Sequence, residues 1–403
     1  MSEFLALLGR QPELSAAELV AVAPTLHATV RPAGEQAAFI EAPDSFAQAF
    51  ERFGGMVKLG IVLSRVPSIK ELASDAFLGG LHRHLPSKGK TVFGVSVYGP
   101  HELQRYGRAL AKRIKTFLTE NGRPARFILG ERGVLSSVVV TKERMTERGI
   151  ELLIVDDGRE IVAAKTIAVQ AFEEFSHRDY GRPGRNATSG MLPPKLARII
   201  VNLAAVDRRS VLLDPFCGSG TILNEALVLG CGTIYGTDLT DRAVRESREN
   251  AAWLARQAEK NADHVHIQKS DVVDLGKHLR PASVDAIVTE PTLGPPQRGT
   301  EDLEAIRQEF GKLYERAFRV FARLARPGAR VVFMLPVFFG PTGPRFFKEI
   351  NRFFGREFRQ LPLLPQHLMA VHASRLSFRG TIVYHRPGQR VGREILVATR
   401  SSG

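Results

Sequence analysis

The segment 211–221 has the residue types and spacing of a binding site for a nucleotide-like ligand. An apolar run ends at Asp214, and Gly218 and Gly220 follow before a helical pattern starts at Thr221. Glycine has no Cβ, so the backbone there can adopt positive φ and pass close to a ligand. The first turn of the helix offers unpaired N–H groups. The pattern predicts a nucleotide-type pocket, although a lone glycine turn can also be an ordinary connection.

Carboxylates stand at the ends of the predicted strands. Asp214 ends the first strand, and Asp238, Asp271 and Glu290 follow the strands predicted at 232–237, 264–268 and 284–289. The carboxyl ends of parallel strands meet at one edge of a sheet, where open α/β folds bind their ligands. Asp238 lies about twenty residues beyond the turn, a spacing at which an acidic side chain can accept from ribose hydroxyls.

This pattern resembles the S-adenosylmethionine site of the Rossmann-like methyltransferases. No Lys or Arg lies between 211 and 229, which argues against a P-loop and suits a cofactor without a pyrophosphate. The resemblance implies that Asp214 and the turn hold the methionine part of the cofactor, that Asp238 binds the ribose and that Asp271 binds the adenine amine. The implied cofactor-binding residues are Asp214, Phe216, Cys217, Gly218, Ser219, Gly220, Thr221, Asp238 and Asp271.

Composition narrows the class of protein. The 403 residues include 56 Lys and Arg against 42 Asp and Glu, and the net charge of +14 favours a polyanionic partner over the alternative of a basic solvated surface. Only two cysteines are present, so we expect no disulfide framework and a reducing, cytoplasmic location. No signal peptide or membrane span is predicted. The histidines show no metal-ligand spacing, and no metal is predicted.

Two small α/β modules precede the catalytic region. The first module, residues 1–67, is predicted to contain strands at 4–8, 37–41 and 57–64 and helices at 12–22 and 45–53. The second module, residues 68–175, is predicted to contain helices at 69–84 and 101–120 and strands at 91–98, 134–141, 151–155 and 161–169. The helix 101–120 has one apolar face and a basic stripe. The stripe is either a solvated face or a phosphate-binding surface, and nearby cations favour the second. It comprises Arg105, Arg108, Lys112 and Lys115, with Lys88, Lys90, Arg123, Arg126 and Arg132 nearby.

Three segments identify a more specific resemblance. The segment 9–15 (GRQPELS), the segment 135–140 (LSSVVV) and the pair Thr166 and Gln170 resemble the THUMP-domain-containing tRNA guanosine N2-methyltransferases. This resemblance implies a ferredoxin-like domain at 1–67 and a THUMP RNA-binding domain at 68–175, which together bind tRNA. It further implies a Rossmann-like, class I methyltransferase domain of α/β class at 192–403.

A linker at 176–191 separates these regions. The run 178–185 (RDYGRPGR) is predicted to be extended and mobile, with Arg178, Arg182 and Arg185 available to a phosphate of the RNA backbone. The following segment 190–197 (GMLPPKLA) resembles the family's signature and enters a helix predicted at 195–205. Asn186 stands where the family pattern leads us to expect Asp.

The acceptor motif departs from the family pattern. That pattern is Asp or Asn, then two prolines, then Tyr or Phe; its oxygens accept the hydrogens of the target amine, and its ring stacks on the base. In the segment 289–296 (TEPTLGPP), Glu290 keeps an acceptor, Pro291 keeps the first proline, Thr292 replaces the second and Leu293 replaces the aromatic residue. The resemblance implies that Glu290, the Pro291 carbonyl and Leu293 hold the exocyclic N2 of a guanosine, at position 10 of tRNA.

Three functions are compatible with this altered motif. The first is methyl transfer to tRNA, because the cofactor turn is intact and a carboxylate can accept from an amine. The second is a THUMP-based tRNA-binding protein that has lost transfer, and the third is a methyltransferase of rRNA or DNA. The sequence leaves open whether one or two methyl groups are added and whether a partner subunit is needed.

Overall fold

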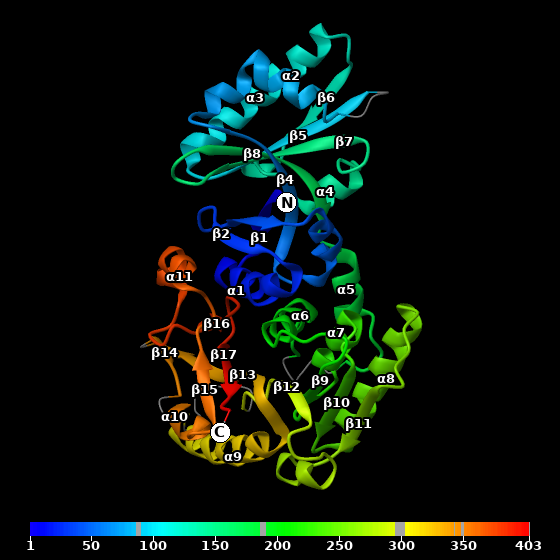
Figure 1. Ribbon diagram of the computed structural model, residues 1–403, viewed down its shortest axis with the longest axis vertical. Helices are drawn as coiled ribbons and strands as arrows, with labels where there is room; N and C mark the ends of the chain where they lie inside the picture. The colour runs from blue at the N-terminus through cyan, green and yellow to red at the C-terminus, as the bar shows by residue number, and fades with distance from the viewer. Residues whose placement is uncertain (86–89, 186–190, 295–302, 342, 348–349, 403) are drawn as a thin grey trace. The chain divides into compact units, whose positions relative to one another are not determined.

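The computed structural model describes residues 1–85, 90–185, 191–294, 303–341, 343–347 and 350–402. Lys88, Asn186, Pro295, Pro296 and the side chain of Arg132, which figure in the predictions, lie outside this description. The chain forms two compact units (Figure 1). The first is Met1–Ala171 with Gln366–Ala373, and the second is Phe172–Pro365 with Ser374–Gly403.

One mixed sheet runs through the first unit in the order β2-β3-β1-β4-β8-β7-β5-β6. Its centre is the antiparallel pair of β4 and β8, which aligns Lys58 with Val169 at one end and Val66 with Ile161 at the other. The two predicted N-terminal modules therefore share one sheet. The strands are β1 (Ser2–Leu8), β2 (Thr29–Pro32), β3 (Ala37–Ala42), β4 (Met56–Val66), β5 (Thr91–Tyr98), β6 (Ala125–Ile128), β7 (Gly149–Asp156) and β8 (Ile161–Val169); the helices are α1 (Pro12–Val22), α2 (Asp75–His82), α3 (His101–Glu120), α4 (Ser137–Lys142) and α11 (Gln366–His372).

The prediction of a strand at 134–141 was wrong, because this segment contains most of helix α4. The Ser136 hydroxyl caps the helix by accepting from the Val139 N–H at 3.3 Å. Just before it, the Leu135 backbone pairs with side chains instead of a neighbouring strand: its N–H donates to Ser96 Oγ at 2.9 Å and its carbonyl accepts from Lys58 Nζ at 2.7 Å. These local hydrogen bonds override the β-propensity of the valines.

Two other helices differ from their predictions. The helix predicted at 69–84 is interrupted at Ser74, which ends a 3-10 turn and caps α2. The helix predicted at 45–53 is a 3-10 helix at Asp44–Arg52. Helix α11, which was not predicted, packs with α1 and β2 of the first unit, and a ring nitrogen of His367 lies 3.2 Å from the Val30 carbonyl.

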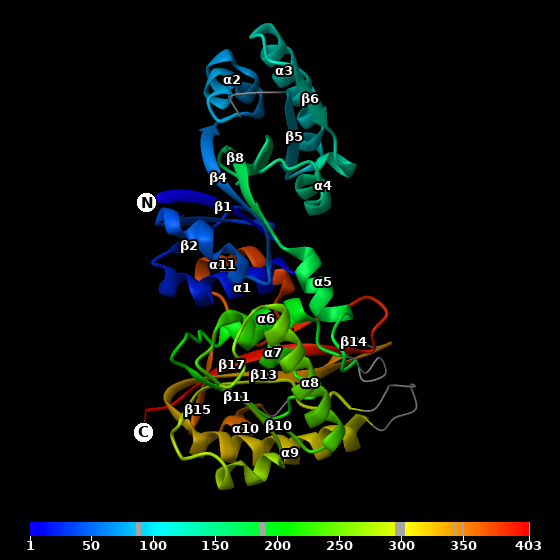
Figure 2. The ribbon, with the colours of Figure 1, turned by 90° about the vertical axis from the view of Figure 1, so that its right-hand side faces the viewer.

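The second unit contains a largely parallel sheet in the order β11-β10-β9-β12-β13-β17-β15. Only β17 runs antiparallel to its neighbours along this path of described strands. Helices α6, α7 and α8 cover one face and α9 and α10 the other (Figure 2). The strands are β9 (Val211–Asp214), β10 (Thr233–Asp238), β11 (Val265–Lys269), β12 (Val284–Thr289), β13 (Ala325–Gly340), β14 (Gly343–Arg345), β15 (Phe358–Leu361), β16 (Ile382–Tyr384) and β17 (Val391–Arg400); the helices are α5 (Phe172–Tyr180), α6 (Pro194–Leu203), α7 (Thr221–Leu229), α8 (Asp241–Gln257), α9 (Leu303–Leu324) and α10 (Ile350–Phe354).

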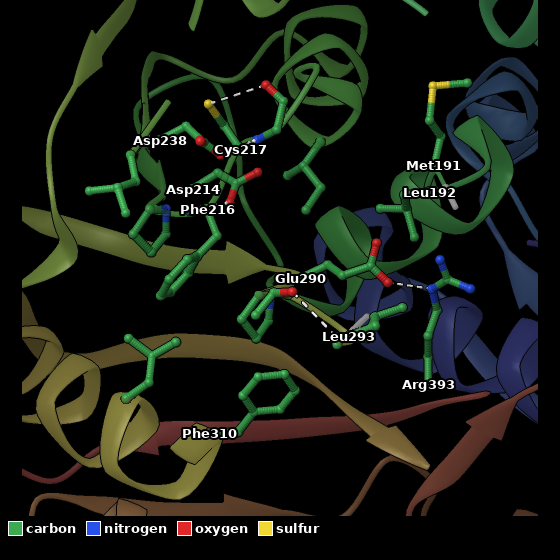
Figure 3. Close-up of a pocket in the computed structure, with 18 of the residues that line it drawn as sticks. Met191, Leu192, Asp214, Phe216, Cys217, Asp238, Glu290, Leu293, Phe310 and Arg393 are labelled. Carbon is green, nitrogen blue, oxygen red and sulfur yellow. Dashed lines mark hydrogen bonds and ion pairs between the residues drawn. The ribbon is translucent and has the colours of Figure 1, made fainter. Parts of the chain in front are cut away.

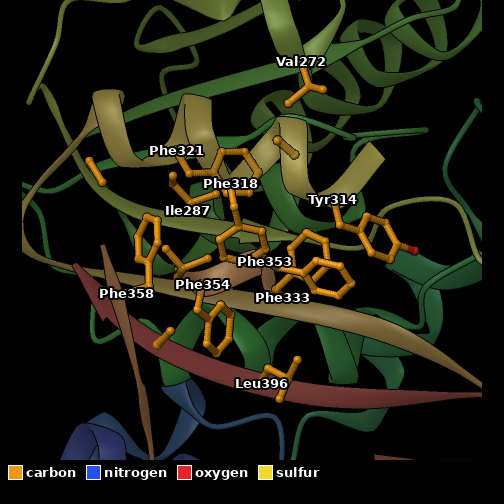
Figure 4. Close-up of a cluster of buried hydrophobic side chains, with 14 of the residues drawn as sticks. Val272, Ile287, Tyr314, Phe318, Phe321, Phe333, Phe353, Phe354, Phe358 and Leu396 are labelled. Carbon is orange, nitrogen blue, oxygen red and sulfur yellow. The ribbon is translucent and has the colours of Figure 1, made fainter. Parts of the chain in front are cut away.

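An aromatic cluster fixes α9 and α10 against this sheet (Figure 4). Phe318 of α9 packs against Phe333 of β13 with ring centroids 5.1 Å apart, and against Phe354 of α10 at 5.2 Å. Tyr314 of α9, one turn earlier, contacts Phe333 edge-on at 5.1 Å. Burial of such rings stabilises the layer and holds the carboxyl end of β12 in place. Among the described residues, no helix is both long and apolar enough to cross a membrane.

The prediction of an extended, mobile run at 178–185 was wrong for residues 178–180, which form the end of helix α5 (Phe172–Tyr180). Arg178 and Arg182 are buried rather than available. Arg178 Nε donates to Glu225 Oε1 at 2.8 Å, and Arg182 donates to Thr221 Oγ1 at 2.6 Å. The linker is therefore held on α7, because each of these two guanidinium groups donates a hydrogen bond to a side-chain oxygen of that helix.

Candidate functional site

A cavity of about 1150 Å³ lies at the carboxyl ends of β9, β10 and β12 in the second unit. Strand order reverses between β9 and β12, and such a switch point leaves a crevice in an open α/β sheet. The glycine turn follows β9 and the acceptor loop follows β12, so the fold brings the two predicted motifs together (Figure 3). The lining includes Asp214, Phe216, Cys217, Gly218, Ser219, Thr221, Asp238, Asp271, Glu290, Pro291, Leu293, Phe310 and Arg393.

The glycine turn has the geometry predicted for it. Gly218 and Gly220 adopt φ of 52° and 82°, which favour glycine. A Cβ on Gly220 would lie 2.4 Å from Ser247 Oγ, whereas one on Gly218 would meet no atom within 4 Å. Gly220 therefore permits close packing of the turn on α8. The Asn250 side chain of α8 reinforces this contact by donating to the Ser219 carbonyl at 2.8 Å.

Asp214 is buried beneath the turn with one oxygen satisfied. Its Oδ1 accepts from Thr289 Oγ1 at 2.6 Å and from the Phe216 N–H at 3.2 Å. Its Oδ2 is buried without a hydrogen-bond partner among the described residues. Burial raises the pKa of Asp214 to about 7, against the opposing effect of the Thr289 hydrogen bond. A buried, half-satisfied carboxylate is costly, and a cationic donor group on a ligand would relieve that cost.

Asp238 and Asp271 both line this cavity. Asp238 Oδ2 accepts from the Gly218 N–H at 3.1 Å, which ties the end of β10 to the turn. Asp271 caps the 3-10 turn Val272–Lys277 by accepting from the Val273 N–H at 3.1 Å. Asp238 Oδ1 also accepts from the N–H and the hydroxyl of Thr240, so the accepting capacity that remains is at Asp238 Oδ2 and on Asp271, since each carboxylate oxygen has two lone pairs.

These features fit the cofactor implied by the sequence. The turn region carries no cationic side chain for a pyrophosphate, while the pocket presents carboxylates and the unsatisfied Asp214 Oδ2. The Cys217 thiol stays protonated, because burial and the neighbouring Asp214 raise its pKa. Cys217 is buried in the turn, and a buried, protonated thiol is a poor nucleophile.

Glu290, in the acceptor loop, pairs with a residue that was not predicted. Its Oε1 accepts from Arg393 Nε of β17, and the two side chains are 14% and 4% exposed. Burial raises the pKa of Glu290, and the Arg393 charge opposes that rise. In Figure 3 the two side chains point toward each other at one side of the cavity. The sequence held one signal for this partner: Arg393 is the one cation in the buried part of β17, residues 392–398.

Several other lining residues were missed. Met191 and Leu192 come from the segment where the linker meets α6, and Phe310 comes from α9. Thr289, which is not part of the lining, supports Asp214 by donating to its Oδ1. Phe310 is almost fully buried and packs against Tyr314 with ring centroids 5.9 Å apart. It gives the pocket an aromatic wall beside Leu293, where the loop itself lacks an aromatic residue.

The predicted RNA-binding residues divide into exposed and buried groups. All four side chains of the α3 stripe, Arg105, Arg108, Lys112 and Lys115, are exposed. Arg185 is exposed as well, with its guanidinium 5.0 Å from the Tyr180 ring centroid. The prediction that Arg178 and Arg182 are available to RNA was wrong, because both side chains are buried and hydrogen-bond to α7 within the second unit.

Comparison with known proteins identifies the family. A family model described as the RMKL-like methyltransferase domain matches residues 182–336. A tRNA (guanine(10)-N2)-dimethyltransferase from Methanothermobacter thermautotrophicus is 34% identical over 151 residues, which cover 37% of this chain and 41% of that protein. A Methanothermococcus thermolithotrophicus protein named after the same reaction is 33% identical over 133 residues, which cover 32% of this chain and 78% of that protein.

The chain belongs to the tRNA guanine-N2 methyltransferase family. Among solved structures, TrmN from Thermus thermophilus superposes with a TM-score of 0.52 at 17% identity, over 99% of both chains. This likeness confirms the predicted α/β fold with a Rossmann-like methyltransferase unit.

Proposed function

We propose that the chain is an S-adenosylmethionine-dependent enzyme that methylates the exocyclic N2 of a guanosine in tRNA, at position 10. One observation carries this proposal: the cofactor turn after β9 and the acceptor loop after β12 face the same cavity in a member of this family. The names of the archaeal relatives, which specify guanine N2 and tRNA, support the choice of target.

The cofactor site rests on three carboxylates. Asp214 Oδ2, unsatisfied among the described residues, would accept from the ammonium of the methionine part. Asp238 would accept from the ribose hydroxyls and Asp271 from the adenine amine. When bound, S-adenosylmethionine supplies a methyl group on a cationic sulfur. The carboxylates and the apolar side chain of Phe216 suit a cation with an aromatic base.

The acceptor loop has to position a weak nucleophile. The lone pair of the guanine N2 is delocalised into the ring, so orientation toward the methyl group matters most. Glu290 and the Pro291 carbonyl would each accept one hydrogen of the amine. As the methyl group passes from sulfur to nitrogen, its C–S bond would break with the electron pair left on sulfur, the new C–N bond would form, and the nitrogen would lose one proton to the Glu290 carboxylate. A carboxylate whose pKa is raised by burial is suited to accept that proton.

Arg393 would act as a positioning residue for Glu290. The side chain of Glu is one methylene longer than that of the Asp expected in the motif, and in this fold it reaches the guanidinium on β17. The ion pair fixes one oxygen and leaves the other to the amine. Leu293 and Phe310 would cover the face of the base by apolar contact.

The first unit would bind the tRNA. We retain as part of this proposal its division into a ferredoxin-like domain at 1–67 and a THUMP domain at 68–175. The exposed α3 stripe supplies cations for the phosphate backbone. A reducing cytoplasm suits the two free, buried cysteines.

The decisive experiment incubates the protein with unmodified tRNA and methyl-labelled cofactor and then maps the methylated nucleotide. N2-methylguanosine is the expected product, and parallel reactions with rRNA and DNA test the other substrates. Asp238→Ala should abolish cofactor binding, whereas Asp241→Ala, at an exposed site three residues away, should not. If the wild-type protein binds tRNA but not S-adenosylmethionine, it is a binding protein and the enzymatic proposal fails.

A further inference from the structure

The segment 374–393 of the second unit contains Arg375, Arg379, Arg386, Arg390 and Arg393 but neither Asp nor Glu. Two of these arginines have internal roles, because Arg379 pairs with the buried Glu394 and Arg393 with Glu290. The remaining three are exposed. Arg386 and Arg390 stand on the turn between β16 and β17, so the positive charge is concentrated at that turn.

Local contacts hold this turn in shape. The His385 ring stacks on Phe339 of β13 with centroids 3.9 Å apart, and its Nε2 lies 2.7 Å from the Gln389 carbonyl. The Phe339 N–H donates to the Arg390 carbonyl at 2.8 Å. Arg386 Nε donates to the Tyr384 hydroxyl at 2.8 Å. A loop constrained in this way presents its cations with little further loss of entropy on binding.

The turn also borders the candidate active site. Gly388, Gln389, Arg390 and Val391 line the same cavity as Glu290 and the glycine turn. A nucleotide whose base enters the cavity therefore leaves its sugar and phosphates at the rim that these residues form. Exposed guanidinium groups at such a rim match phosphate in both charge and geometry.

We propose that the β16–β17 turn is an RNA-docking surface, in which Arg386 and Arg390 bind the phosphates that flank the target nucleotide. This inference rests on the proposed function for its choice of RNA. It adds a contact surface on the catalytic unit to the α3 stripe of the first unit. Phosphate contacts carry no sequence information, so the turn sets affinity and register while the cavity selects the base.

The test compares the full-length wild-type protein with Arg386→Ala/Arg390→Ala in binding unmodified tRNA without cofactor, over a range of salt. The plot of log K against log salt has a negative slope. Each lost phosphate contact should make this slope less steep by about 1, so the slope of the double variant should be less steep by about 2. The ratio of wild-type affinity to variant affinity should then be about 16-fold smaller at 200 mM than at 50 mM salt. Arg386→Lys/Arg390→Lys should retain most of the slope.

Arg319→Ala/Arg323→Ala is the matched control, since these arginines are also exposed and four residues apart, on α9 of the same unit. An unchanged slope in the turn variant, or an equal loss in the control, would overturn the docking surface. So would an equal loss of affinity for a DNA duplex, which would make the turn a general polyanion site. Because binding is measured without transfer, this outcome is independent of whether the protein methylates tRNA.

Discussion

At the residue scale, the proposed role of Asp214 predicts that cofactor binding depends on pH. Its pKa of about 7 in the free protein means that it is half protonated near neutrality. A cationic ligand binds the carboxylate form, so binding below pH 7 must first remove a proton. We expect S-adenosylmethionine to bind about tenfold more weakly at pH 6 than at pH 8. Calorimetry at the two pH values checks this, and a pH-independent affinity would contradict it.

The same carboxyl group should limit stability in the absence of cofactor. Its pKa is higher in the folded protein than the ordinary 3.8, so the unfolding free energy should fall as pH rises from about 4 to about 7. Asp214→Asn has no such titration. The variant should gain stability over the wild type, and the gain should be larger at pH 8 than at pH 5, as measured by denaturant unfolding. A gain that is equal at both pH values would refute the link to this carboxyl.

The ion pair of Glu290 and Arg393 should affect how the rate of methyl transfer depends on pH. Glu290 must be ionised to accept from the amine, so kcat/KM for tRNA at saturating cofactor should rise with pH through its pKa. Burial raises the pKa of Glu290, and the Arg393 charge lowers it. Among the described residues, Asp214 on β9 and Tyr314 on α9 also interact electrostatically with Glu290.

Removing the arginine charge should therefore move this rising limb to higher pH. Arg393→Met should show the shift, Arg393→Lys should largely restore the wild-type limb, and Arg319→Met, on the exposed side of α9, should leave it in place. A lower rate in Arg393→Met without a shifted limb would mean that Arg393 acts only through folding.

At the scale of elements, local pattern predicted most helices and strands, and long-range partners decided the exceptions. The helix predicted at 101–120 from its apolar face and basic stripe has the bounds of α3 in the structure. Helix α4 did not, because Lys58 and Ser96, far away in the sequence, pair with the Leu135 backbone. The run containing Arg178 was predicted as a mobile linker, since nothing in its composition points to Glu225, a buried carboxylate 47 residues further on.

Glu225 should stabilise the linker segment that contains Arg178, which connects the two units along the chain. It accepts from Arg178 at 2.8 Å and from Arg198 at 2.7 Å, and all three side chains are buried. Glu225→Gln removes the buried carboxylate that the two guanidinium groups share and should lower the unfolding free energy by about 3–5 kcal/mol. Glu174→Gln removes an exposed partner of Arg178 and should cost less than about 1 kcal/mol. Equal losses in urea denaturation would contradict the special role of Glu225.

At the scale of the whole molecule, the sequence predicted the parts of the site that lie close to one another along the chain. Asp214, the two glycines and Asp238 have a fixed spacing because one βαβ unit carries them. The partner of Glu290 had no such spacing, since Arg393 arrives on a strand 103 residues later. Arg386 and Arg390 were missed for the same reason: only the fold brings their turn to the cavity.

Basic surfaces on both units predict that tRNA affinity and cofactor affinity can be changed separately. Arg108→Ala/Lys112→Ala/Lys115→Ala removes exposed charges from α3, which belongs to the first unit, while the cavity belongs to the second. This triple variant should weaken tRNA binding and lower the salt slope by up to about 3, with no change in cofactor affinity. Binding titrations over salt together with calorimetry measure the two quantities independently. An unchanged tRNA affinity would mean that the α3 stripe is a solvated face, and RNA recognition would then have to reside elsewhere on the chain.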